Sequence, residues 1–186
     1  LIGSVVIGVI MNVILSGMLI KVISKKYVDE PIKTSDYSSI VKLILPLLAL
    51  GILQGVVIFA GSLLLVIPGI ILSMGLLLSA HVMVIEKRGI VDSLYRSWNL
   101  TKGYKWSMFG FWFVVGGLIS GGILIVGELI LRQVLMSASI GNLDTFFMLY
   151  VVIRHFIVAL VTPILVSVLV VVFFNLKVDK EGFNLE

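Results

Sequence analysis

The chain contains no cysteine, so its fold cannot depend on disulfide bonds, and it has neither a thiolate metal site nor a cysteine nucleophile. Histidine is also scarce. Only His81 and His155 occur, and a metal site needs several ligands that converge on one point. Glycine-rich phosphate loops, nucleophile elbows and zinc-protease motifs are missing as well. We therefore expect no metal, no cofactor and no catalytic site of the common types.

The chain also has few charged residues. Charged residues form 13% of the 186 residues and apolar residues form 60%, whereas soluble domains average about 25% and 45–50%. The 43 residues from Leu43 to Ile85 include no Asp, Glu, Lys or Arg. One helix of that length would measure about 65 Å, roughly twice the thickness of a bilayer core. The segment is therefore expected to cross a membrane twice, as a helical hairpin that turns at Pro68-Gly69.

The same reasoning predicts one all-α integral membrane domain over residues 1–186, a polytopic transmembrane helix bundle. Five crossings are expected, at about 1–20, 43–67, 70–85, 106–131 and 154–174. Polar connectors at 21–42 and 86–105, a tail at 175–186 and an interfacial approach at 143–153 complete the chain. Because Leu1 is not a methionine, we expect a further helix before it, which would give the intact protein six crossings.

Basic residues are concentrated between the apolar segments. The two connectors and the tail hold twelve of the 14 Lys and Arg residues. Basic residues in short loops stay on the cytoplasmic side of a membrane, so both connectors and the C-terminus are predicted to be cytoplasmic. This topology accounts for the net charge of +4, and no nucleic-acid partner is expected.

The connector 86–105 has a helical pattern of its own. Its larger apolar residues recur at helical spacing: Ile90, Val91, Leu94, Tyr95 and Trp98. This pattern predicts an amphipathic helix on the cytoplasmic membrane surface, with basic residues directed to lipid phosphates. The candidate contacts are Arg88, Arg96, Lys102 and Lys105. In the alternative interpretation, the helix packs beneath the bundle as a simple connector.

Four ionisable residues are predicted at the opposite rim of the membrane. They are Glu128, Arg132, Arg154 and His155. Arginine binds phosphate through two parallel hydrogen bonds, so the group is a candidate anion or lipid-headgroup site. The alternative is ion pairing between helices, with the long side chains reaching towards water.

Two glycine pairs have the four-residue spacing that lays small residues along one ridge of a helix. One is Gly51 with Gly55, and the other is Gly117 with Gly121. Such ridges allow close helix packing. The pairs are predicted either to pack within this chain or, at Gly117 and Gly121, to meet a partner or a second copy.

The more specific motifs of the chain lie outside the apolar runs. Glu86 is followed by DSLYRSWNLTKG at 92–103, and the tail reads NLKVDKEGF at 175–183. With the IPGI of the hairpin at 67–70, these motifs resemble the bacterial family that includes the membrane domain of glycerophosphoryl diester phosphodiesterases and its uncharacterised stand-alone relatives. The resemblance covers about residues 62–183. It implies a bundle of about six helices in a bacterial plasma membrane. It does not imply phosphodiesterase activity, because the family's chemistry belongs to a separate soluble domain.

These observations favour a non-enzymatic membrane protein that acts as an anchor, scaffold or regulatory subunit. Its expected partners are membrane lipids and either another membrane protein or a second copy of itself. The alternative is a transporter or lipid-handling protein, because interrupted helices such as the hairpin and the helix containing Pro163 often mark substrate sites. Asn12 and Gln54 would then line a pore, or else hydrogen-bond between helices. An intramembrane enzyme that uses Glu128, Arg154 and His155 is a third interpretation.

Overall fold

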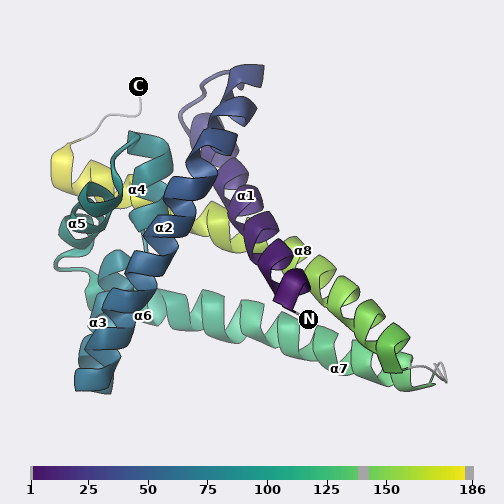
Figure 1. Ribbon diagram of the computed structural model, residues 1–186. Helices are drawn as coiled ribbons and strands as arrows, with labels where there is room; N and C mark the ends of the chain where they lie inside the picture. Colours follow the sequence, from purple (N-terminus) through teal and green to yellow (C-terminus); the bar gives the residue numbers. More distant parts are fainter. Residues whose placement is uncertain (1, 138–142, 183–186) are drawn as a thin grey trace. The chain divides into compact units, whose positions relative to one another are not determined.

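The computed structural model describes residues 2–137 and 143–182, and within that part of the chain it is helical, without a β-strand (Figure 1). The prediction of an all-α fold is therefore confirmed. The elements are α1 (Ile2–Tyr27), α2 (Thr34–Leu64), α3 (Val66–Leu76), α4 (Ser79–Glu86), α5 (Ile90–Thr101), α6 (Lys105–Trp112), the π-helix η1 (Phe113–Gly121), α7 (Gly122–Ser137) and α8 (Leu143–Glu181).

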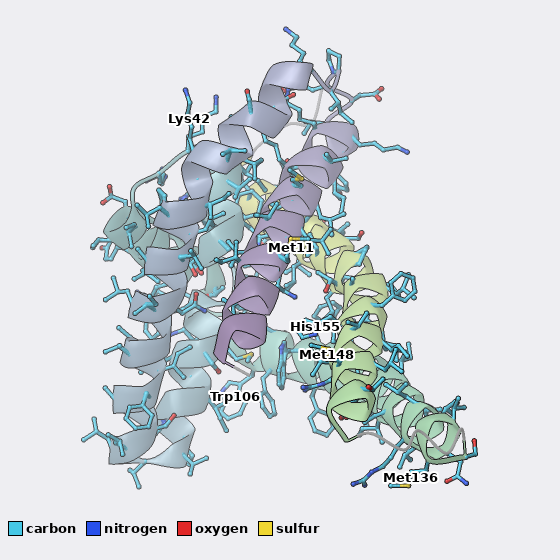
Figure 2. All side chains as sticks on the ribbon, turned by 45° about the vertical axis from the view of Figure 1, so that its right-hand side comes forward. Met11, Lys42, Trp106, Met136, Met148 and His155 are labelled. Atoms are coloured by element: carbon cyan, nitrogen blue, oxygen red, sulfur yellow. The ribbon has the colours of Figure 1, made fainter. Side chains whose placement is uncertain are left out.

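Five helical stretches among the described residues are long and apolar enough to cross a membrane. They are Gly8–Tyr27, Ser38–Leu64, Val66–Glu86, Lys105–Val134 and Met148–Glu181. Each overlaps one of the five predicted crossings. Large apolar side chains project outward along α2, where Leu45 is 75% exposed and Leu64 is 78% exposed (Figure 2). Such exposure is costly in water and favourable in lipid.

The chain forms two compact units, Leu1–Phe109 with Val166–Glu186, and Gly110–Leu165. In the first unit, α2 contacts α1, α3, α4 and α5, and the end of α8 contributes to the same core. The most deeply buried apolar residues of that core include Ile40, Leu50, Val82, Leu100, Val170 and Phe173. In the second unit, α7 lies against α8, and a Cβ added at Gly127 would be 3.4 Å from the Ile157 side chain.

The predicted turn at Pro68-Gly69 is wrong by a few residues. The chain reverses at Leu65, which has an extended backbone (φ −165°, ψ 154°), and α3 begins at the next residue. Pro68 lies in the first turn of α3, where a missing N–H costs no helical hydrogen bond. Gly69 allows α2 and α3 to approach, because an added Cβ would lie 3.0 Å from the Ser62 Cα. The hairpin is therefore present, but proline and glycine serve helix initiation and packing.

Four predicted segments also differ from the structure. The return pass 70–85 is not one helix, because α3 ends at Leu76 and α4 begins at Ser79. The segment 106–131 includes η1, where several glycines weaken the preference for α-helical geometry. The predicted interfacial approach 143–153 and most of the tail belong to α8, which runs without a break past Pro163. The length of an apolar run therefore predicts a long apolar helical stretch better than it predicts where the helices within it begin and end.

Candidate functional site

Hydroxyl groups from α5 form hydrogen bonds with the backbone where the chain is interrupted between α3 and α4. Ser97 Oγ donates a hydrogen bond to the Gly75 carbonyl (2.9 Å) and accepts one from the Leu78 N–H (3.2 Å). Thr101 Oγ1 lies 3.2 Å from the same Gly75 carbonyl. Leu78, Ser97 and Thr101 are fully buried, so these bonds supply partners that water cannot reach. The broken helix is thereby held rigid from one side.

Gly75 has a second role in the same contact. A Cβ at this position would lie 2.6 Å from Trp98 Cζ3, so only glycine lets the indole ring rest on the α3 backbone. The Lys105 ammonium group also lies over this ring, 2.8 Å from the ring centroid. This is a close cation–π contact. The loop between α5 and α6 is therefore fastened to α3 through Trp98.

The connector 86–105 contains a helix, α5, but the buried face of this helix is not the predicted apolar stripe. Ser93, Ser97, Leu100 and Thr101 form the buried face, whereas Val91 and Tyr95 are 68% and 70% exposed. The contacts of α5 with α3 and α4 match the alternative in which this helix packs against the bundle. Its placement on a membrane surface stays a prediction.

A cluster of ion pairs joins α4, α5 and the end of α8. We define the Glu86 cluster as Glu86, Arg88, Arg96, Lys177 and Glu181. Glu86 accepts hydrogen bonds from Arg88 Nε (2.7 Å) and from Arg96 Nε and Nη2 (3.1 Å each), and Lys177 Nζ lies 3.4 Å from its Oε1. Arg96 also pairs with Glu181. The Glu86 side chain is only 9% exposed, so its charge depends on these cations.

The charge balance of the cluster has a clear effect on Arg96. Burial opposes the positive charge of Arg96, but hydrogen bonds to Glu86 and Glu181 outweigh burial and raise the pKa of its guanidinium group. Arg88 and Arg96, predicted as contacts to lipid phosphates, therefore have carboxylate partners within the chain. Contact of Arg88 and Arg96 with lipid phosphates stays a prediction.

The end of α8 is also fastened to the loop after α5. Lys180 Nζ donates hydrogen bonds to the carbonyls of Asn99 (2.7 Å) and Lys102 (2.6 Å), which lie at the C-terminal end of α5. A cation at this end of a helix is favoured by the helix dipole. Tyr104 donates a hydrogen bond to Asp179, and this bond raises the pKa of the tyrosine. The part of the predicted tail that belongs to α8 therefore lies against the predicted connector, as Figure 1 shows for the end of α8 beside α5.

A second ionic group stabilises the connection between α1 and α2. Asp36 pairs with Lys25 (2.8 Å) and Lys21 (3.4 Å), and its Oδ2 accepts a hydrogen bond from the Lys33 N–H (2.9 Å). The hydrogen bond from Lys25 is the main reason why the pKa of Asp36 lies well below its ordinary value. Lys42, on the outward side of α2, lies near the same end of the helix (Figure 2).

The predicted outer-rim residues are only partly brought together. Arg154 Nε lies 3.8 Å from Glu128 Oε2, which joins α8 to α7. The His155 ring contacts the Val151 carbonyl of its own helix (2.7 Å), and Arg132 is exposed. The Glu128–Arg154 pair matches the interpretation of ion pairing between helices. An anion site at this rim stays a prediction.

The two predicted glycine ridges lie in different units, and each is described within its own unit. A Cβ at Gly51 or Gly55 would meet nothing within 4 Å, and a Cβ at Gly117 or Gly121 would meet only atoms of η1. Packing of these glycines within the chain therefore stays a prediction. Contact of Gly117 and Gly121 with a partner or a second copy stays a prediction.

The polar residues of the apolar helices have separate surroundings. Gln54 Oε1 lies 2.8 Å from Ser79 Oγ, so Gln54 makes the predicted contact between helices. Asn12 contacts Ser16 one turn along α1 (3.4 Å). His81 is 4% exposed, and neither of its ring nitrogens has a hydrogen-bond partner. Among the described residues, no group of three acidic or histidine side chains could hold a metal ion.

Sequence reasoning missed the hydroxyl face of α5 and the contacts of Lys180. Ser93, Ser97 and Thr101 recur at four-residue spacing, and this signal could have identified a face built for close packing. No local signal indicates Lys180, because its acceptors lie 78 and 81 residues away along the chain.

Comparison with family models, with curated proteins and with solved structures finds no match to this chain. The family resemblance of the hairpin, connector and tail therefore stays a prediction.

Proposed function

We propose that this chain is a non-enzymatic integral membrane protein that serves as an anchor, scaffold or regulatory subunit at the bacterial plasma membrane. Five long apolar helices with outward-facing Leu, Ile, Val and Phe side chains support insertion into a bilayer. The concentration of Lys and Arg in the connectors and the tail supports a cytoplasmic location for these segments.

The main support for the proposal is the set of ion pairs and hydrogen bonds that hold the tail against the connector. The Glu86 cluster and the two hydrogen bonds of Lys180 fix the end of α8 against α4 and α5. Ordering a tail of long charged side chains costs conformational entropy, and the ion pairs and hydrogen bonds offset that cost. The result is a preorganised polar surface at the end of an apolar bundle, which suits docking of another component.

The resemblance to the membrane domain that accompanies some phosphodiesterases supports the same role. In such an arrangement the membrane part positions a partner at the lipid surface and leaves the chemistry to that partner. We extend this role to the present chain as a proposal.

The test is affinity purification of the full chain in mild detergent, after chemical crosslinking in the membrane. The proposal predicts a protein crosslinked to α5 or to the end of α8, and less of it for Arg96→Gln. Arg132→Gln is the matched control, because it also removes an arginine charge but at an exposed position outside the cluster. Absence of a crosslinked partner, together with solute movement by the purified chain in proteoliposomes, would contradict a scaffold.

A transporter or lipid-handling protein is the second candidate. It is favoured by the interruption between Leu76 and Ser79, which falls inside an apolar stretch long enough to cross a membrane. In this chain, however, the freed backbone groups already have partners in Ser97 and Thr101. This satisfied geometry supports a structural use of the interruption.

A further inference from the structure

An apolar pocket of about 250 Å³ lies between α3 and the start of α6. Its walls are Ile67, Ile70, Ile71, Met74, Gly103, Lys105, Trp106 and Phe109. Met74 is 4% exposed, whereas Ile67 and Trp106 are 63% and 72% exposed. The pocket therefore has a buried floor at Met74 and an open, apolar rim, where Figure 2 labels Trp106.

The shape of this wall suits a hydrocarbon chain. One face of α3 supplies four residues of the lining, Ile67, Ile70, Ile71 and Met74. From Ile67 to Met74 the helix rises by about 10 Å. The volume is slightly below the range of about 300–1,000 Å³ that is typical of pockets for whole small molecules. A segment of an extended acyl chain is narrow enough for such a groove and would gain from burial of its methylene groups.

The charge of the residues around the pocket indicates the charge of the ligand that the pocket would bind. Lys105 is the one charged residue among the described residues of the lining, and its ammonium group lies over the Trp98 ring. Within the described part of the chain, no carboxylate lies within ion-pair distance of Lys105, whereas Lys21, Lys25 and Lys177 all have one. Lys102, on the same short turn between α5 and α6, is exposed and adds a second positive charge. An anionic group at this rim would supply the missing counter-charge.

We propose that this pocket binds an anionic phospholipid, with one acyl chain along α3 and the headgroup phosphate at Lys105. The orientation agrees with the proposed topology, because α6 begins at the cytoplasmic connector and α3 leads away towards the hairpin turn. This inference rests on the proposed membrane location and adds a ligand class to it.

The experiment measures how lipid stabilises the purified full chain in a neutral detergent. The probes are phosphatidylglycerol, phosphatidylcholine with the same acyl chains, and soluble glycerol 3-phosphate. We expect phosphatidylglycerol to stabilise the chain more than either of the other two probes does. Equal stabilisation by phosphatidylcholine would overturn the proposed charge recognition, and equal stabilisation by glycerol 3-phosphate would overturn the acyl-chain contact.

Single substitutions test whether the stabilisation by phosphatidylglycerol comes from binding at this pocket. Lys105→Met should weaken phosphatidylglycerol binding about fivefold, which is the factor expected for one lysine at an anionic surface, and Lys105→Arg should restore it. Lys26→Met, an exposed lysine far along the chain from the pocket, is the matched control and should leave binding unchanged. Ile71→Trp should fill the groove and weaken binding while Lys105 remains. Equal losses for Lys26→Met and Lys105→Met, or no loss for either pocket variant, would refute the site.

Failure of the site can be distinguished from failure of the proposed function. Membrane fractionation and alkaline extraction of the same variants report insertion without reference to lipid binding. A chain that stays in the membrane but does not discriminate between phosphatidylglycerol and phosphatidylcholine would refute the pocket alone. A chain that leaves the membrane on alkaline extraction would refute the proposed function itself.

Discussion

Replacement of Gly69 by alanine tests the packing of the hairpin formed by α2 and α3. The added Cβ would lie 3.0 Å from both Cα and Cβ of Ser62, and the Cα belongs to the backbone of the opposite helix. A contact this short can be relieved only if the two helices separate. Overpacking of this kind costs about 1–3 kcal/mol.

Gly51→Ala is the matched control for this substitution. Gly51 lies in α2 as well, but a Cβ there would meet nothing within 4 Å. Alanine is favoured over glycine in a helix by about 1 kcal/mol, so Gly51→Ala should be neutral or stabilising. Because the same propensity gain applies to Gly69→Ala, the two variants should differ in the sign of their effect.

Thermal unfolding in one detergent, followed by the amount of protein that still elutes at its native volume, measures both variants. We expect a lower midpoint for Gly69→Ala and an unchanged or higher midpoint for Gly51→Ala. Ser62→Gly should recover part of the loss in Gly69→Ala, because it removes the opposing side chain. Equal midpoints for the two single variants would refute the close approach of α2 and α3.

Three further predictions concern polar contacts. Ser97→Ala leaves the buried Leu78 N–H without a partner and should lower the free energy of unfolding by about 1–3 kcal/mol, whereas Ser137→Ala, whose hydroxyl bonds only within α7, should change thermal stability little. Glu86→Gln removes the carboxylate shared by three cations, so trypsin should cleave the end of α8 faster at unchanged membrane content. Because the pKa of Asp36 is lowered on folding, its contribution should persist above its ordinary pKa of about 4 and decline as pH falls below it; Asp36→Asn should remove this pH dependence from the unfolding midpoint.

Much of the helical architecture follows from the lengths of the apolar runs. A charge-free stretch such as Leu43–Ile85 is too long for one crossing, and the structure divides it into α2 and the α3–α4 pair. All five predicted crossings correspond to a helical stretch of suitable length and hydropathy. Chain length and hydrophobicity are local properties, so the sequence alone expresses them.

The ends and interruptions of helices were harder to predict. Proline suggested a turn at Pro68, but proline is also well tolerated in the first turn of a helix, where Pro68 lies. The reversal occurs at Leu65, a residue without any turn preference. The break after Leu76 depends on Ser97 and Thr101, which become its partners only after α5 has folded back.

The candidate site was only partly visible for a similar reason. The basic character of the connector predicted a charged surface that contains Arg88 and Arg96. It did not predict that Glu86 would gather them, or that Glu181 would reach Arg96 from the far end of the chain. Ion pairs between segments so far apart form only in the tertiary fold. No local pattern in a single sequence indicates which of these residues will pair.

The absence of cysteine makes the central claim directly testable, because each introduced thiol is the only one in the chain. Asp92→Cys lies in the connector and Gln133→Cys lies near the end of α7, and both native side chains are exposed. A membrane-impermeant maleimide should label Gln133→Cys in intact cells, whereas Asp92→Cys should be labelled only after the cells are opened. Labelling of Asp92→Cys in intact cells, or equal labelling of both positions, would contradict a bundle that holds its charged connector in the cytoplasm.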